Sequence, residues 1–570
     1  GTYVPQTTRV TFDSTVSNQF IQSGGQPFYN VTFNGSGGSW VLSSTLTVNN
    51  DLILAAGTLD TRTGSNHGIL VGHDWANTGG AFIVRNASVT LMGAGTDAIV
   101  ESGNSNFWKV LVQGPGRWKT IADPVTVSSM MIVNGGTFQV ASSSFSVPMI
   151  DVNAGGTFEV AHDVWLSSGI LDNDGVVVSL STPVVTSSGT GRLGGSGITQ
   201  LPHVTLTGNA QTTTLAGPVH MLGLLSNTGT HILDANNTGN FAMTVSSSWL
   251  NAGTYQARTS SVTLNGSSPG LTITSGNQNF HMVRMAGSAM YTPVTHQVTV
   301  SSSLVIDAGG LTVSGTSITI TGDVSIRAGG SLVLDNNIRV SGGDVLNGGS
   351  ISTTVNTSTL TIVGVGLLGG SGSSNLPHIV LTGLSTTTLA GTISVAGQLT
   401  NGTGHGLDVS GNHYQMTLSS SFYNNGSFVP QQGTVEFTGT GTFTGSTTFY
   451  NFTSVTPNIT LNFAAGTTRY VTNDLTLTGA AGNLLRIRSV PINSPAGFKV
   501  SGTANINYVD VQDNYATMGI TLIANNSTNS GNNRNWDFGS MLHTWWGGAS
   551  VDWAAGGNWD IGYAPSASDS

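Results

Sequence analysis

The chain repeats itself at two scales, and this repetition constrains its fold more than any other feature of the sequence. At short range, VNGGTFQVA, which contains Gly135 and Phe138, returns 20 residues later as VNAGGTFEVA, which contains Gly155 and Phe158. Repeats of about 20 residues, with glycines between short V-x-V or F-x-V segments, leave no room for a helix in each copy. This pattern predicts the successive turns of a parallel β-solenoid.

A longer unit of about 173 residues contains these short repeats. GAFIVRNASVTL begins at Gly80, and related segments, GTYQARTSSVTL and GSFVPQQGTVEF, begin at Gly253 and Gly426, at intervals of 173 residues. LGGSGITQLPHVTLTG from Leu193 likewise returns as LGGSGSSNLPHIVLTG from Leu368. The spacing predicts a partial unit, three further units, and a tryptophan-rich joint that starts another unit, at residues 1–79, 80–252, 253–425, 426–540 and 541–570, respectively.

The first residues, GTYVPQTTRVTF, belong to the same set. Val10 stands nine residues after Gly1, as Val89 stands nine residues after Gly80. We therefore expect Gly1 to lie inside repeat material, either at a cut or on a face that meets another copy.

The residue composition supports an all-β fold and excludes several classes of partner. Val, Ile, Leu and Phe alternate with Thr and Ser, as in SITITG, which is typical of half-buried strands. Hydrophobic residues make up 38% of the chain, so it has enough apolar material to form a core despite only 7% charged residues. We expect no membrane insertion, since no apolar run approaches the roughly 18 residues of a membrane helix. The net charge is −10 with only three lysines, which argues against nucleic acid as a partner.

The C-terminal passages resemble a known kind of protein. YVDVQDNYA and NNSTNSGNNRNWDF, followed by the spaced tryptophans of 545–559, resemble joints between repeat arrays in large secreted bacterial β-helix proteins. These are the autotransporter-like and filamentous-haemagglutinin-like surface proteins. The resemblance covers roughly residues 500–570 and, more loosely, the Gly/Thr/Asn-rich turns of the whole chain. It implies a right-handed parallel β-helix, extracellular display and a structural or adhesive role, and right-handed winding is also the general rule for parallel crossovers.

Two motifs are candidates for catalytic or metal sites. GHG at His405 and RIR at Arg486–Arg488 resemble fragments of the polygalacturonase signature, but the paired aspartates that should precede them are missing. LDNDGV, with Asp172 and Asp174, resembles the start of a calcium loop without its later ligands. We interpret His405 as a corner residue and the aspartates as turn residues. Asp513, which follows a strand, is interpreted as a solvent-facing group. The sequence thus predicts no catalytic residue, no metal site, no cofactor and no enzyme.

The expected function is that of a structural component of an extracellular bacterial surface fibre, whose turns continue or stack end to end on copies of itself. Two alternatives stay open: an adhesin that binds glycans or host surfaces, and a polysaccharide lyase or hydrolase. An adhesin would cluster exposed aromatic side chains on one face, and the enzyme would cluster carboxylates with basic residues. Trp546 and Trp553 are the candidates for stacking on sugar rings. The residues proposed for assembly are Val10, Thr11, Phe12, Trp545, Trp546, Trp553 and Trp559.

Overall fold

The structure, a computed structural model, describes residues 6–516, 519–539, 545–548, 550–559 and 564. It is an all-β parallel solenoid of about 25 turns, with successive turns about 21 residues apart. The only helix in these ranges is the short 3-10 helix η1 (Gly556–Asn558). The predicted fold class is confirmed, whereas the handedness of the winding stays a prediction. Among the described residues, no helix has the length and hydrophobicity to cross a membrane.

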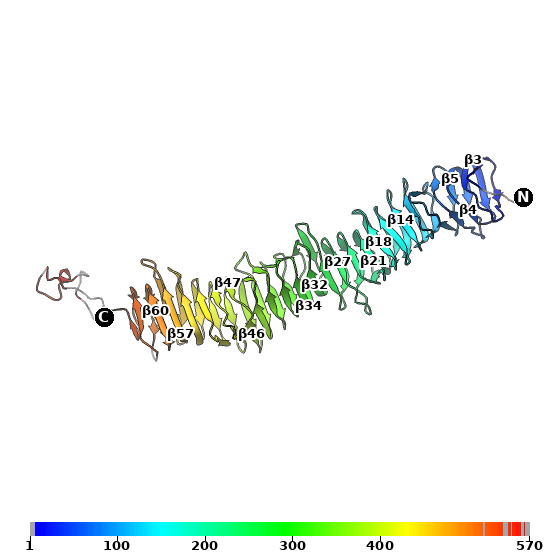
Figure 1. Cartoon of the computed structure of the whole chain (residues 1–570). Coiled ribbons are helices and arrows are strands. Elements are labelled where there is room, and N and C mark those ends of the chain that lie inside the picture. The colour runs from blue at the N-terminus through cyan, green and yellow to red at the C-terminus, as the bar shows by residue number, and fades with distance from the viewer. Residues whose placement is uncertain (1–5, 517–518, 540–544, 549, 560–563, 565–570) are drawn as a thin grey trace. The chain divides into compact units, whose positions relative to one another are not determined.

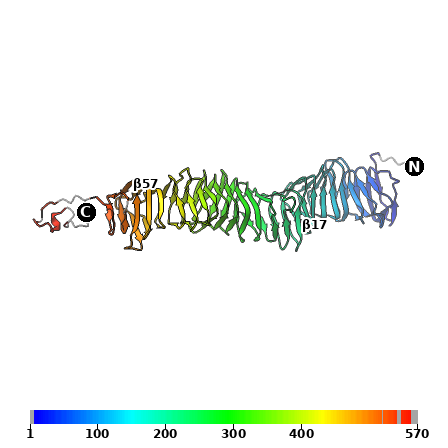
Figure 2. The ribbon, with the colours of Figure 1, turned by 90° about the horizontal axis from the view of Figure 1, so that it is seen from below.

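The chain divides into two compact units, Gly1–Ser301 and Ser302–Ser570. Within each unit, strands of successive turns lie side by side, as Figures 1 and 2 show. The division does not fall at a border of the predicted repeat units, and those borders stay a prediction.

Parallel pairing in register forms the first unit. Strand β14 (Gly136–Val140) pairs with β16 (Gly156–Val160), so that Phe138 lies opposite Phe158. Their rings stack inside the solenoid, with centroids 6.1 Å apart and an interplanar angle of 12°. Beside them, β15 (Phe145–Val152) pairs with β17 (Val164–Asn173), which Figure 2 labels. The 20-residue repeat of the sequence therefore becomes a column of identical side chains.

The second unit is built in the same way. Strand β46 (Thr386–Leu389) pairs with β49 (Gly406–Asp408), which pairs with β52 (Ser427–Val429), all in parallel. Inward residues such as Leu389 and Leu407 are buried, and outward residues between them are partly exposed. The period-two alternation of the sequence thus separates core from surface in these turns.

The longer repeat reappears as equivalent strands with equivalent contacts. Strands β7 (Trp75–Asn77), β28 (Trp249–Asn251) and β51 (Phe422–Asn424) begin 174 and 173 residues apart. Each places a buried aromatic ring edge-on to a second ring six or seven residues later. The centroid distances are 4.8 Å for Trp75–Phe82, 4.9 Å for Trp249–Tyr255 and 5.8 Å for Phe422–Phe428.

Buried asparagines link successive turns in both units. The Nδ2 atom of Asn227 donates to Oδ1 of Asn251 at 2.8 Å, and Nδ2 of Asn251 donates to the Ser275 carbonyl oxygen at 2.8 Å. In the second unit, Nδ2 of Asn401 donates to Oδ1 of Asn424, also at 2.8 Å. Buried polar groups normally require such partners. The asparagine columns therefore allow polar side chains inside the solenoid and tie each turn to the next.

Some glycines are required because backbones of adjacent turns approach closely. A Cβ atom added at Gly217 would lie 1.8 Å from the carbonyl oxygen of Gly195, and one added at Gly391 would lie 2.0 Å from that of Gly370. Gly195 and Gly370 belong to the repeated LGGSG motif. A Cβ atom added at Gly195 or at Gly370 would itself lie 2.2 or 2.3 Å from the carbonyl oxygen of Asn173 or of Asn347, so this position of the motif also requires glycine.

We predict that Asn227→Ala destabilises the protein by roughly 2 to 4 kcal/mol, because Nδ2 of Asn227 is buried and its two hydrogens are shared among three acceptors. Urea unfolding followed by circular dichroism measures the change in midpoint. Asn209→Ala is the control, since the side chain of Asn209 is exposed and donates no hydrogen bond to the residues that the structure describes. Equal midpoints for the two variants would refute a stabilising role for the asparagine column.

Candidate functional site

The first predicted assembly residues lie in strand β1 (Arg9–Phe12), which pairs in parallel with β3 (Asn30–Leu42). Val10 and Thr11 lie opposite Val31 and Thr32, and the Phe12 ring stacks on Phe33 at 5.1 Å with an interplanar angle of 13°. Among the described residues, β3 is the only strand paired with β1. Its other edge therefore presents backbone groups that could accept a further strand.

The structure brings three of the four predicted assembly tryptophans together. The Trp545 ring stacks on Trp553 at 5.7 Å, and the Trp559 ring lies edge-on to Trp553 at 4.4 Å. Nε1 of Trp559 donates to the Trp553 carbonyl oxygen at 2.8 Å. Trp546 takes no part in this cluster and is 71% exposed. Of the two residues suggested for sugar stacking, Trp553 therefore packs against other rings of the cluster, whereas Trp546 lies outside the cluster.

A further exposed tryptophan was missed in the sequence. Trp165 projects from β17 between Ser146 of β15 and Thr186 of β19 (Val184–Ser187), and it is 49% exposed. It lines a shallow groove of about 410 Å³ together with Ser144, Ser146, Asp163 and Thr186. The alternation in VWL places Trp165 outward between the buried Val164 and Leu166, and that signal was available in the sequence. An aromatic face flanked by hydroxyls and a carboxylate combines apolar contact with hydrogen-bonding groups.

A carboxylate and basic cluster also forms on adjacent turns of the first unit. Asp151 lies opposite Asp172 in the pairing of β15 with β17, and Arg192 forms an ion pair with Asp172. Burial is the main cause that raises the pKa of Asp151, and the negative charge of Asp172 raises it further. Two neighbouring carboxylates could serve as a general acid and a general base, but Asp172 is already held in an ion pair by Arg192 of the next turn. Asp174 is exposed and accepts hydrogen bonds from the backbone and side chain of Ser196, which lower its pKa.

The fragments that resemble polygalacturonase lie in different turns. His405 is fully buried before β49, and its Nε2 atom lies 3.0 Å from Oγ1 of Thr387. Arg488 lies in β58 (Leu485–Val490) and forms an ion pair with Asp510. His231 repeats the arrangement of His405 in the first unit, 3.0 Å from Oγ1 of Thr213. Both histidines therefore contribute to the polar interior.

The interpretation of Asp513 as a solvent-facing group is wrong. This carboxylate is only 1% exposed and accepts hydrogen bonds from the backbone N–H of Asn493 and from Nδ2 of Asn532. It satisfies backbone and amide donors at a corner where Asp513 itself has a φ of 58°. From the sequence alone, a buried aspartate at the end of a strand cannot be told apart from a solvent-exposed one, because the residues that cover it belong to neighbouring turns.

We predict that the protein loses stability as the pH falls below about 6.5, because burial lowers the pKa of His231 and of His405. The unfolded chain then binds protons that the folded imidazoles do not, which costs at most about 1.4 kcal/mol per pH unit for each histidine. Urea midpoints at pH 7.5 and pH 5.5 measure this loss. The paired variant His231→Gln/His405→Gln should reduce the pH dependence, whereas His413→Gln, at an exposed position, should leave it unchanged. An identical pH dependence in all three proteins would contradict the prediction.

Comparisons with family models, with curated proteins and with solved structures find no match to this chain.

Proposed function

We propose that the chain is a structural segment of an extracellular bacterial surface fibre, a scaffold whose extent is set by the number of its repeats rather than an enzyme. The observation that carries this proposal is the return of the same inter-turn contacts in successive repeats. Examples are the aromatic pairs Trp75–Phe107, Trp249–Phe280 and Phe422–Phe449 and the asparagine columns of Asn227 and Asn401. Contacts of this kind join each turn only to its neighbours, so turns can be added or removed without changing those that remain.

Addition of a further repeat or of a second copy would use the same backbone pairing and aromatic stacking. Strand β1 has an unpaired edge among the described residues, and Phe12 extends the aromatic column of Phe33 and Trp40 up to that edge. A turn from a neighbouring repeat or from a second copy would continue both the backbone hydrogen bonds and the aromatic column. A surface location is part of this proposal and follows from the resemblance to secreted β-helix proteins.

Removing one complete repeat should leave a folded protein. Deletion of residues 253–425 joins Ala252 to Gly426. Gly426 then stands two residues after Asn251, which ends β28, just as it stands two residues after the equivalent Asn424, which ends β51, in the full chain. The deletion removes 173 residues, or roughly eight turns, so the longest dimension should fall by about 40 Å at ~4.8 Å per turn. Small-angle scattering measures this dimension, and circular dichroism checks the strand content.

An out-of-register deletion is the control for this experiment. Removal of 253–415 joins Ala252 to Met416 and displaces the strands by about half a turn, so inward and outward positions no longer stack. This variant should unfold or aggregate. The scaffold proposal would be overturned if the in-register deletion behaved as badly, or if it folded without becoming shorter.

A second candidate function is glycan binding, favoured by the groove at Trp165. The indole is half-exposed in a strand where the neighbouring outward residues are Ser146 and Thr186, and Asp163 lies at the same groove. Such a surface would present one flat apolar face to a sugar ring and polar groups to its hydroxyls.

If this groove binds glycans, Trp165→Ala should lower binding on a glycan array at least tenfold. Phe20→Ala is the matched control, because Phe20 is an aromatic residue of the same unit that is 66% exposed and lies outside the groove. Equal binding by wild type and both variants would exclude Trp165 as the binding residue. Absence of binding by wild type would exclude the adhesin alternative for the glycans on the array.

A further inference from the structure

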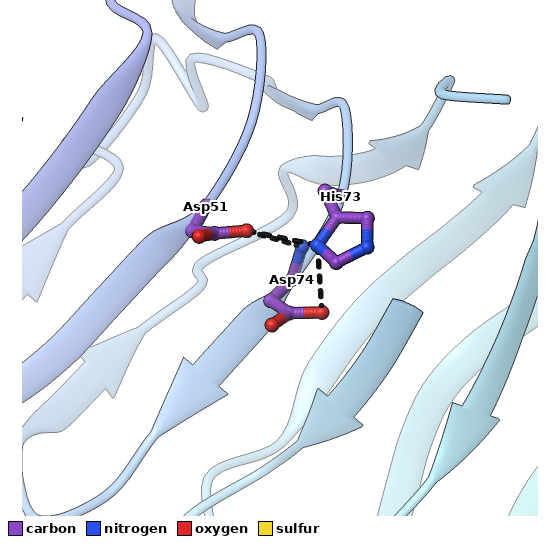
Figure 3. A group of neighbouring side chains, drawn as sticks. All are labelled: Asp51, His73 and Asp74. Atoms are coloured by element: carbon purple, nitrogen blue, oxygen red, sulfur yellow. Dashed lines mark hydrogen bonds and ion pairs between the residues drawn. The ribbon is translucent and has the colours of Figure 1, made fainter. Parts of the chain in front are cut away.

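Three metal-ligating side chains converge at the start of two successive turns in the first unit (Figure 3). Asp51 precedes β5 (Leu52–Asp60), and His73 and Asp74 precede β7, which pairs with β5. Nδ1 of His73 lies 2.9 Å from Oδ1 of Asp51 and 3.0 Å from Oδ1 of Asp74. One ligand atom from each residue lies within 4.8 Å of the other two.

The contacts within this cluster exceed what one imidazole N–H can satisfy. Nδ1 can direct a single hydrogen, and only the contact with Asp51 has hydrogen-bond geometry. Oδ1 of Asp74 is equally near without that alignment. Among the described residues, neither carboxylate forms an ion pair with Lys or Arg. An imidazole nitrogen and two carboxylate oxygens that point at one place are a donor set for a first-row divalent cation.

The later repeats show that the fold does not require these three groups. Asp74 accepts a hydrogen bond from the backbone N–H of Ile99 at 2.9 Å. At the equivalent positions, Oγ of Ser248 accepts from the Thr272 N–H at 2.9 Å, and Oγ of Ser421 accepts from the Thr442 N–H at 3.0 Å. A serine therefore caps the next strand as well as the aspartate does. The equivalents of Asp51 are Leu224 and Gln398, and those of His73 are Ser247 and Ser420.

The surroundings hold the imidazole in place and leave it accessible. An added Cβ at Gly95, in the following turn, would lie 2.7 Å from Cδ2 of His73, so glycine makes room for the ring. Nε1 of Trp118 donates to the His73 carbonyl oxygen at 3.1 Å and fixes the backbone. The side chain of His73 is 35% exposed. Water can therefore fill the remaining coordination positions.

We propose that Asp51, His73 and Asp74 bind a divalent transition-metal ion of the Zn²⁺ class, with water as the remaining ligands. Nδ1 of His73 loses its proton on binding, so that the imidazole carries its hydrogen on Nε2. The ion links two successive turns, Asp51 from one and His73 with Asp74 from the next, and offsets the charge of the two carboxylates. This site is independent of the scaffold function and of the Trp165 groove.

Isothermal titration of the whole chain with ZnCl₂ at pH 7.5 tests the proposal. The matched variant His73→Ser/Asp74→Ser carries the residues that the later repeats have at these positions, and it should fold as wild type does. It should bind one Zn²⁺ fewer per chain, or bind that ion at least tenfold more weakly. Asp51→Leu, which introduces the residue type that the next repeat has at Leu224, should have the same effect, whereas Asp174→Ser, at an exposed acidic position, should bind as wild type does.

Co²⁺ supplies a second readout, because ligand-field absorption reports a bound ion directly. Wild type should develop visible bands that Zn²⁺ removes, and the two site variants should not. Titrations that are the same for wild type and the folded double variant would overturn the proposal. So would the absence of any Zn²⁺ binding by wild type.

Discussion

The parallel hydrogen-bond ladder between successive turns is the interaction on which the rest of this structure depends. A strand of three to five residues has no independent stability, and the inner strands here are held by the strands of the turns before and after them. Register is the essential variable, because a slip by one residue would reverse inward and outward side chains. The pairing of Gly136–Val140 with Gly156–Val160 shows the result, with Phe138 on Phe158 inside and Gln139 beside Glu159 outside.

Once register is set, like side chains stack, and the stacking determines which residues the interior tolerates. Apolar residues form continuous columns, and asparagines form columns of their own, such as Asn227 with Asn251, in which one side-chain amide donates to the oxygen of the next. Buried histidines follow the same rule through Thr213 and Thr387. Arg469 is an extreme case: it is 1% exposed, burial lowers its pKa to about 9, and its guanidinium donates to the carbonyl oxygen of Phe443. Each of these buried polar groups therefore has a hydrogen-bond partner in an adjacent turn.

The periodic features could be predicted from the sequence because they depend only on spacing. The turn length, the strands around Phe138 and Phe158 and the all-β fold follow from glycine punctuation and period-two alternation. The contacts between turns could not be predicted in the same way. Asp51 and His73 are 22 residues apart, and they meet because Leu52 pairs with Trp75, which places Asp51 beside Asp74 and His73. Asn251 at the end of a strand and Asp513 at a corner both look like solvent groups until the adjacent turn covers them. The outward position of Trp165, by contrast, was readable from the alternation alone.

Amide hydrogen exchange monitored by mass spectrometry tests most directly the claim that the turn, held by its two neighbours, is the stabilising element. We expect slow exchange in the strands and fast exchange at the corners, recurring with a period of about 21 residues through both units. A described stretch longer than one full turn whose strand amides exchange at the rate of an unfolded chain would contradict it.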